Sequence, residues 1–550
     1  MSDVLRSFTR LRDKLGAEAG IGFNISKFRI LAATPLSESD KQLLREAGLP
    51  PPVPLITFAK LPVSLDPQLV TEYLSDRVRR HSPYFESLKE VENIQARYAL
   101  LRYTAAARFG YLARAMPPDL AMRPLQDAQR MIDEAVAVML ELGGTDIPHD
   151  HLELIRLPIR LGGFGVGDLS VTSNCGYVSS RGQAAAHCHS LRVSSADSNT
   201  AANAFLLKAL KTIIDMGADC DSTKGIIPES GSVPEFLRAC EALPSTKGMQ
   251  KLLTKVIQND RHHRLLERAP PHMSAIMEAT RVVGSGRLLT MRPSPQFQVP
   301  SSQFAMSLRQ RAALPLIVAT HFRFGVQQQQ GMLATARCRM CAGGLSEDVR
   351  GGQHFMTCPS VCTSQSGQKR IEMMAKEIRE TMTSVGAACI VHPPETQRDA
   401  LTVLIEIDDN FKLEVAVTSA HRTRNDMMAP EGHRPDALGK VKQLESDIVE
   451  RHHHPLVLEV NGFISEVSKT TCEGLTAIAV AHGVYHSVSA QHLQNRLACA
   501  LSRGCYAMVR SAFREWTTNN QLMSARLSIE HRRQQLFAVI NDNIRNQIAL

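Results

Sequence analysis

A cluster of cysteine and histidine residues near the middle of the chain constrains its fold more than any other feature. Cys338 and Cys341 form a C-x2-C pair, and His354 and Cys358 follow after a twelve-residue gap as H-x3-C. Zinc takes four such ligands in a tetrahedron, and a C-x2-C turn supplies two thiolates from one loop. The spacing therefore predicts a closed, structural Zn2+ site of the CCHC zinc-knuckle type. Cys362 is an alternative to Cys358 as the fourth ligand.

Length and charge limit the class of protein. A chain of 550 residues is long enough for about three or four domains. A formal charge of +9 favours a polyanionic partner, nucleic acid first, although a mildly basic enzyme surface gives the same charge. An aromatic content of 5% argues against stacking platforms for single-stranded bases.

Hydropathy and cysteine usage predict the compartment. The chain contains no run of eighteen apolar residues and no signal-peptide pattern at its start, so we expect no membrane association. The cysteines outside the zinc cluster do not form a disulfide framework. We therefore expect an intracellular, reducing location.

Hydrophobic periodicity predicts a mainly helical first half and a mixed second half. In the first half the expected elements are a helix over 3–18, a strand over 23–33, helices within 66–148, a loose connector within 190–235 and further helices within 236–330. In the second half they are a helix over 369–384, strands over 401–407 and 411–418, a helix over 436–451, a strand over 455–462, and helices over 472–483 and within 490–548.

Three segments carry a family resemblance. Residues 20–27 are GIGFNISK, residues 106–118 are AARFGYLARAMPP, and residues 157–169 are LPIRLGGFGVGDL. In this order, with the zinc cluster after them, they resemble the C-terminal half of the reading frame of non-LTR retrotransposons that encode a restriction-like endonuclease. The first segment is similar to the element that follows the polymerase's catalytic aspartates, and the other two are similar to its thumb signatures.

The resemblance implies an α+β multidomain protein with a mainly helical thumb and connector, a small zinc knuckle, an α/β restriction-endonuclease-like (PD-(D/E)XK) domain and a helical tail. It also implies target DNA and the element's RNA as partners, and a nuclear location. The implied domains are a partial reverse transcriptase (post-catalytic palm and thumb) at 1–190, a helical connector at 191–330, the zinc knuckle at 331–365, the endonuclease domain at 366–488 and the tail at 489–550.

The polymerase half of such a protein is not expected to work in this chain alone. Phosphoryl transfer to a growing strand needs clustered acidic ligands for two metal ions. No Y-x-D-D tetrapeptide occurs in the sequence. Lys27 resembles a polymerase lysine near the incoming nucleotide, and it stays a candidate nucleic-acid-binding residue.

A candidate nuclease centre lies further along the chain. A restriction-type site needs two carboxylates on adjacent strands to hold Mg2+ or Mn2+, and a lysine. Asp399 opens one predicted strand after Arg398, and Glu414 lies fifteen residues later on the next strand. A hairpin of that length can bring two carboxylates together. Asp399 and Glu414 are therefore the predicted catalytic residues and magnesium ligands, with Arg398 as a candidate nucleic-acid contact.

The lysine of this site has two candidates. Many restriction enzymes have it two residues after the second acid, where this chain has Ala416. In the family a lysine on the following helix takes that role, and Lys440 or Lys442 stands there. These two point about 200° apart on a helix, so only one can serve. Three features depart from the family pattern: its Arg-Pro-Asp is Gln-Arg-Asp at 397–399, its usual second acid is Asp and not Glu, and the spacing from Glu414 to Lys440 is long.

Three functions are compatible with these features. The first is a nucleic-acid-binding protein with metal-dependent DNA nicking activity that lacks the polymerase active site. The second is a non-catalytic nucleic-acid-binding remnant or domesticated element protein. The third is a helical scaffold with one zinc clip, which would lack salt-dependent DNA affinity. The geometry of the two acids and the lysine discriminates the first from the second, and the oligomeric state stays open.

Overall fold

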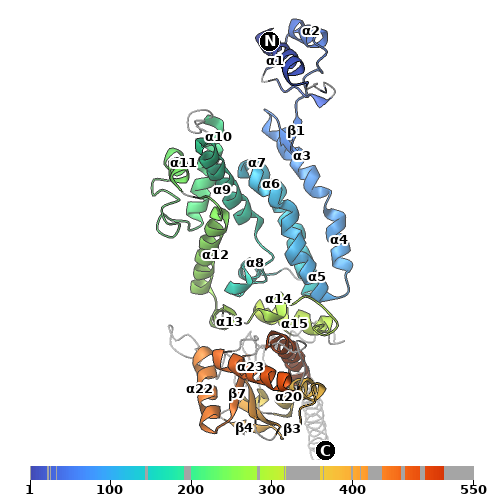
Figure 1. Cartoon of the computed structure of the whole chain (residues 1–550), viewed down its shortest axis with the longest axis vertical. Coiled ribbons are helices and arrows are strands. Elements are labelled where there is room, and N and C mark those ends of the chain that lie inside the picture. The colour runs from blue at the N-terminus through green and yellow to red at the C-terminus, as the bar shows by residue number, and fades with distance from the viewer. Residues whose placement is uncertain are drawn as a thin grey trace, which may run out of the picture. The chain divides into compact units, whose positions relative to one another are not determined.

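The structure is a computed structural model whose elements are labelled in Figure 1. It describes residues 2–512 except 21–23, 25–26, 33, 143–146, 191–199, 244, 282–284, 315, 317–358, 363, 398–399, 409–410, 419–436, 460–464 and 483–489. Two compact units form: unit 1 comprises Met1–Leu88, Tyr103–Ala135 and Gly167–Arg261, and unit 2 comprises Lys89–Arg102, Val136–Val166 and His262–Leu550. Unit 1 joins pieces of two predicted domains and unit 2 joins pieces of all five, and the predicted domain boundaries stay predictions.

Unit 1 is built almost entirely from helices. Its elements, some of which continue into unit 2, are α1 (Ser2–Ala19), α2 (Glu38–Glu46), β1 (Ile56–Phe58), β2 (Leu61–Val63), α3 (Pro67–Arg79), α4 (Ser82–Glu90), η3 (Ala106–Phe109), α6 (Gly110–Ala115), α7 (Pro118–Met139), α9 (Leu169–Ser190), α10 (Thr200–Asp215), α11 (Val233–Ala242) and α12 (Met249–Arg268).

Unit 1 differs from expectation in two segments: one contains a helix that was not expected, and in the other the expected strand is wrong. The segment 190–235, expected to include a loose connector, also contains α10, whose Leu206, Leu210 and Ile213 are buried against α9 and α11. Burial of these apolar side chains outweighs the Ser- and Asp-rich composition around them. The strand expected over 23–33 is reduced, in its described residues, to one β-bridge between Ile30 and Pro52.

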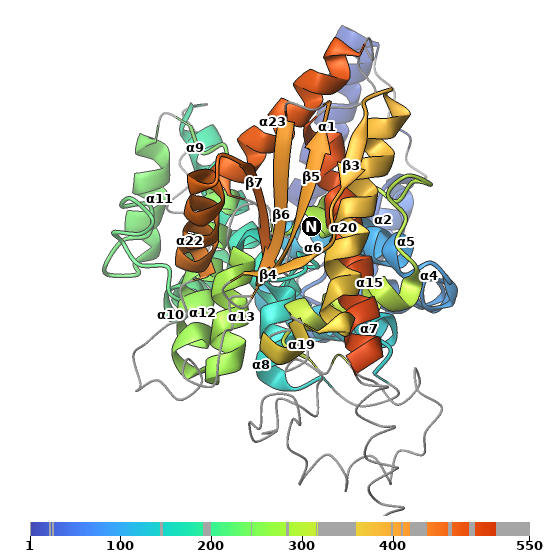
Figure 2. The same ribbon diagram turned by 90° about the horizontal axis from the view of Figure 1, so that it is seen from below.

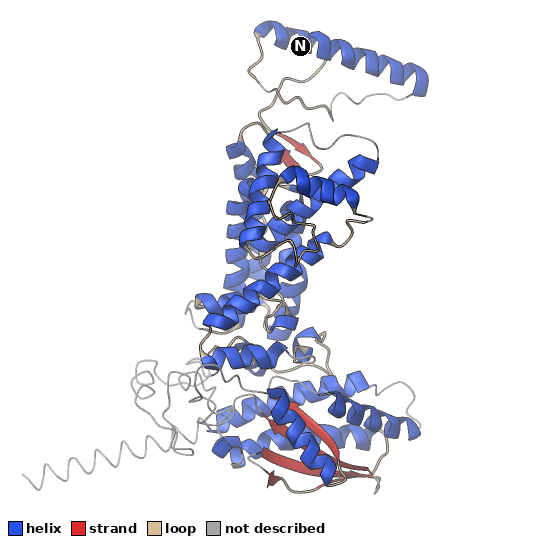
Figure 3. Ribbon diagram, turned by 90° about the vertical axis from the view of Figure 1, so that its left-hand side faces the viewer, coloured by secondary structure: helices blue, strands red, loops and turns tan. Residues whose placement is uncertain are grey.

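Unit 2 combines helices with the larger sheet (Figure 3). Its elements are α5 (Ile94–Leu100), which continues into the π-helix η2 (Leu101–Ala105), α8 (His149–Arg156), η4 (Ile159–Leu161), α13 (Pro271–Arg281), α14 (Arg287–Thr290), α15 (Ser301–Arg311), α19 (Pro359–Cys362), α20 (Gln365–Ser384), β3 (Cys389–Val391), β4 (Glu395–Gln397), β5 (Ala400–Ile407), β6 (Phe411–Thr418), α22 (Ala437–Glu450), β7 (His454–Glu459), α23 (Glu466–Ala481) and a helix over residues 490–512.

The sheet of unit 2 is mixed, with strand order β3-β5-β6-β7 and β4 also paired to β5. β5 is antiparallel to β3, β4 and β6, whereas β7 is parallel to β6. A parallel neighbour requires a crossover connection, and α22 lies in that connection. The chain is therefore an α+β protein, mainly helical with one small mixed sheet, as expected.

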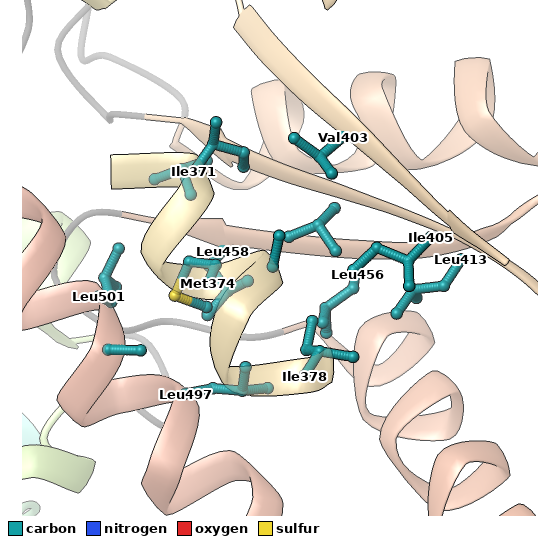
Figure 4. Close-up of a cluster of buried hydrophobic side chains, with 14 of the residues drawn as sticks. Ile371, Met374, Ile378, Val403, Ile405, Leu413, Leu456, Leu458, Leu497 and Leu501 are labelled. Atoms are coloured by element: carbon teal, nitrogen blue, oxygen red, sulfur yellow. The ribbon is translucent and has the colours of Figure 1, made fainter. Parts of the chain in front are cut away.

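The two faces of this sheet have different cores. Strand residues such as Val403, Ile405 and Leu456 point toward α20 and the helix over 490–512 (Figure 4). Residues at alternate positions on the strands point to the opposite face, where Ala416 and Val457 meet α22. Alternation with period two separates the two sets. Figure 2 shows α20 and α22 on opposite sides of the sheet.

No helix in the described part of the chain is both long enough and apolar enough to cross a membrane.

Candidate functional site

Strand β6 places Glu414 on the face of the sheet that α22 covers. Its neighbours Leu413 and Val415 belong to the apolar cluster on the other face, whereas Ala416, two residues on, packs in the small cluster under α22. Glu414 thus interrupts a run of buried apolar residues, since positions 413–418 are all buried. The expected strand over 411–418 is confirmed, and its one acidic residue lies inside the protein.

The turn between α22 and β7 places two cationic side chains beside this carboxylate. His452 takes a left-handed φ of 61° just after the helix, so the chain reverses there. Arg451 precedes this residue and His453 follows it. β7 then begins at His454, whose ring stacks on Phe411 with centroids 4.1 Å apart. The three consecutive histidines therefore have three different environments.

Both oxygens of Glu414 are engaged. Arg451 donates from Nη2 to Oε1 at 2.8 Å and from Nε to Oε2 at 3.2 Å, and His453 Nδ1 lies 3.0 Å from Oε2. The Glu414 side chain is only 3% exposed, against 35% for Arg451 and 19% for His453. A carboxylate taken out of water needs such partners, and a bidentate arginine is a strong one. The cluster thus consists of a nearly buried carboxylate and two more exposed side chains that contact it.

This arrangement does not fit a magnesium ligand. A metal ion would have to displace Arg451 or His453 from oxygens that both already accept hydrogen bonds. Mg2+ sites also use several oxygen ligands and usually keep bound waters, whereas Glu414 is almost inaccessible. The position two residues on is Ala416, buried among apolar side chains, so this position supplies no lysine.

The strand register separates Glu414 from the beginning of β5. Glu414 pairs with Leu404, whereas the described part of β5 begins at Ala400, the residue after Asp399. Four residues of extended strand correspond to about 13 Å. Asp399 and Arg398 themselves lie outside the described residues. The pairing of Asp399 with Glu414 around one ion stays a prediction.

The two candidate lysines stand near the beginning of α22. This helix turns Val441, Leu444 and Ile448 toward the sheet. Lys442 is exposed, one helical step from Val441. Position 440 lies one turn before Leu444, but the side chain of Lys440 lies outside the described part of the structure.

The remaining predicted site residues are placed as follows. The zinc cluster of Cys338, Cys341, His354 and Cys358 lies outside the described residues and stays a prediction. Lys27 is exposed in unit 1, where its backbone N–H donates to Asn24 O at 3.0 Å.

The other buried carboxylates in the described residues also have partners. Glu377 on α20 pairs with Arg496, and Glu445 on α22 accepts hydrogen bonds from Ser465 and Ser468, the latter at 2.7 Å. The one group of three potential metal ligands found in the described residues consists of His149, Asp150 and Glu153 on α8. Both of its acids pair with Arg268. The described residues thus offer no open carboxylate cluster on the sheet.

A cluster of cations lies in unit 1. The guanidinium of Arg108 lies 3.7 Å from the ring centroid of Tyr84, as in a cation–π contact. Burial, then Arg108 and Arg77, lower the pKa of His81, so this ring resists protonation beside two positive charges. Arg77 also donates to the carbonyl of Lys60. Arg77 on α3 and Arg108 on η3 therefore place two positive charges near the ring of His81.

Neither a scan of protein-family models nor a search of curated proteins found a match to this chain.

Sequence reasoning missed the partners of Glu414. Arg451 and His453 lie 37 and 39 residues further along the chain, and only the parallel pairing of β6 with β7 brings them close. One signal was available: a glutamate inside a buried strand requires a cation, and an arginine followed by three histidines stands directly before the next buried strand.

Proposed function

We propose that this chain is a nucleic-acid-binding protein whose C-terminal region has a restriction-endonuclease-like core, in which Glu414 is a buried counter-ion and not a metal ligand. One observation carries this choice: both Glu414 oxygens are occupied by Arg451 and His453 in a site that is 3% exposed. The function is thus closer to that of a non-catalytic binding protein than to that of a nuclease.

The order of elements supports the restriction-endonuclease-like core. A helix, α20, precedes the antiparallel strands β3, β5 and β6, and the crossover helix α22 then leads to the parallel strand β7. Apart from the first residue of α20, these elements lie in residues 366–488, the segment for which the family resemblance implies an α/β restriction-endonuclease-like domain. A fold alone does not carry an activity, because activity depends on the residues of the site.

The charge supports a nucleic-acid partner. The net charge of +9 produces a field that attracts polyanions. Arg77 and Arg108 act on the same histidine ring, which indicates a local concentration of positive charge. Cations of this kind bind phosphates with little dependence on base sequence.

A second candidate function is metal-dependent nicking. It is favoured by the position of Glu414 on a central strand of the sheet, paired with β5, the strand that follows Asp399 in the sequence. In that case Glu414 would have to leave Arg451 when metal and DNA bind.

One experiment separates these functions. Purified full-length protein is incubated with supercoiled plasmid and Mg2+ or Mn2+, and its affinity for a labelled duplex is measured by fluorescence anisotropy over a salt series. We expect affinity that falls steeply with salt, because counterions are released on binding, and no nicking above an EDTA control. Nicking that EDTA and Glu414→Gln both abolish would establish the second candidate. Affinity that does not change with salt would contradict both functions.

A further inference from the structure

A cavity of about 540 Å³ lies in unit 1 beside α2. Its wall consists of residues just before α2, one side of that helix, the proline-rich segment 51–54 and the residues that follow β2. Two hydrogen bonds join these pieces: Val53 N–H donates to Ile30 O at 2.9 Å, and Ser64 Oγ donates to Pro54 O at 2.6 Å. The cavity is therefore bounded by segments that are bonded to one another.

The lining of this cavity is mainly aliphatic. Nine of the sixteen described residues that line it are leucine or proline, and among these Leu44 and Leu49 are buried. Proline side chains offer no hydrogen bond, and none of the described lining residues is aromatic, so a flat ring has no stacking partner here. Pro35 and Pro51 are exposed, so the cavity opens to solvent. This lining fits a flexible alkyl chain better than it fits a nucleobase.

One cation on the lining has no partner. Lys41 and Arg45 stand one turn apart on α2, and Lys41 Nζ donates to Glu38 Oε1 at 2.6 Å. Asp66 accepts the backbone N–H of Gln68 at 2.8 Å as the N-cap of α3. The exposed side chain of Arg45 forms no hydrogen bond or ion pair with a described residue. Lys41 first, and the charge of Arg45 last, lower the pKa of Glu38, which bonds only to Lys41. The guanidinium of Arg45 is therefore open to an anionic group.

We propose that this cavity binds a free alkyl carboxylate, the chemical class of a fatty acid, with its chain along the leucines and prolines and its carboxylate at Arg45. This inference goes beyond nucleic-acid binding and does not depend on it. Each methylene group that leaves water favours binding, and a guanidinium matches a carboxylate in geometry and charge. A nucleic-acid phosphate lacks the alkyl chain and a neutral apolar molecule lacks the acid, so the two features together select an amphiphilic anion.

Calorimetric titration of the full chain tests the chemical class. Sodium hexanoate, octanoate and decanoate are each titrated below the critical micelle concentration. We expect one saturable site per chain, with affinity that rises by up to about fourfold for each methylene group buried. Octan-1-ol, which has the same chain as octanoate without the charge, is titrated in parallel.

Substitutions locate the site and its cation. Ala32→Phe fills the cavity from its lining and should abolish octanoate binding, whereas Ala242→Phe, at an exposed position of α11, is the matched control and should not. Thr34→Trp, on the exposed part of the lining, should act like Ala32→Phe and replaces it where Ala32→Phe does not fold. Near-UV circular dichroism confirms that each variant is folded.

The charge is tested by the ratio of octanoate affinity to octan-1-ol affinity. This ratio should fall about fivefold in Arg45→Gln, the range of an exposed ion pair, and should be largely kept in Arg45→Lys. Arg238→Gln, which removes an exposed charge from α11, is the control and should leave the ratio unchanged.

Four results would overturn the inference. Equal octanoate binding in Ala32→Phe and Ala242→Phe would place the bound chain elsewhere. A ratio that does not change in Arg45→Gln would assign the cavity to neutral apolar molecules. Co-sedimentation with phosphatidylglycerol vesicles that requires Arg45, without a response to octanoate, would assign it to a membrane lipid. Self-association in ultracentrifugation that Ala32→Phe abolishes, without a response to octanoate, would assign it to a second copy of the chain. Salt-dependent duplex binding is measured separately, so the proposed function stands or fails independently of these results.

Discussion

The two faces of the sheet in unit 2 are both covered by helices, but their buried side chains differ in kind. The face toward α20 is mainly apolar, with Ile405, Leu413 and Leu456 fully buried. The face toward α22 has a small apolar cluster beside a buried carboxylate, Glu414, that needs Arg451 and His453. On the first face, stability depends on how completely the apolar side chains fill the core. On the second face, it also depends on whether the buried carboxylate keeps its cationic partners.

This difference bears on function. A restriction-type nuclease needs acids that are open to metal and substrate. On the α22 face the acids Glu414 and Glu445 are buried and bonded to neighbouring side chains. In the described residues, these two acids of the α22 face therefore stabilise the fold and are not open to a metal ion or a substrate. The predictions that follow test this contrast from the largest expected effect to the smallest.

Ile405→Ala should have the largest effect. Ile405 is fully buried on β5, and its truncation leaves a cavity in the apolar face. We expect a loss of about 3 kcal/mol in the free energy of unfolding, measured by urea denaturation. Ile390→Ala removes the same atoms from a residue that is 53% exposed on β3 and should cost less than about 1 kcal/mol. Equal losses at the two positions would contradict the apolar-face assignment.

Arg451→Ala should have an intermediate effect. It leaves the Glu414 carboxylate buried with His453 as its remaining partner, and we expect a loss of about 2 kcal/mol. In a Glu414→Gln background the same substitution should cost clearly less, because no buried charge then needs Arg451. Lys412→Ala, which removes a partially exposed partner of Glu406, is the control and should cost less than about 1 kcal/mol. Additive losses for Arg451 and Glu414 would show that the two residues are not coupled.

The pH dependence at the rim of the apolar face should be the smallest effect. His482 Nε2 lies 2.7 Å from Asp408 Oδ2, and Ala388 N–H donates to Oδ1 at 2.9 Å. The His482 hydrogen bond first, then that of Ala388, lower the pKa of Asp408 below its ordinary 3.8. The unfolded chain therefore binds a proton first as the pH falls, so this stabilisation is present above pH 3.8 and is lost as the pH falls through the folded value. Urea denaturation of wild type and Asp408→Asn should differ at pH 7 and converge as the pH falls through the pKa of folded Asp408, below 3.8; a constant difference would refute this role.

Elements with regular periodicity could be predicted from the sequence. The alternation in residues 401–407 and 411–418 predicted β5 and β6, and the apolar spacing at Val441, Leu444 and Ile448 predicted α22. These patterns are local, so no distant contact is needed to recognise them. Confirmation of these elements also confirms the strand position of Glu414.

Elements that depend on distant contacts could not be predicted. β3 and β4 each have three residues and exist only because they pair with β5. α23 begins at Glu466, six residues before the expected start, because Ser465 caps it and Ser468 bonds to Glu445 on α22. The same limit applies to the site: a carboxylate in a strand looks the same in sequence whether it binds a metal ion or an arginine.

Mn2+ binding measured by isothermal titration calorimetry tests the central claim most directly. The unsubstituted protein and Glu414→Gln are titrated under identical conditions, each with and without a duplex oligonucleotide. The account predicts the same heats and the same number of bound ions in both proteins, because Glu414 bonds to Arg451 and His453 and not to a metal ion. One Mn2+ site present in the unsubstituted protein and lost in Glu414→Gln would contradict it.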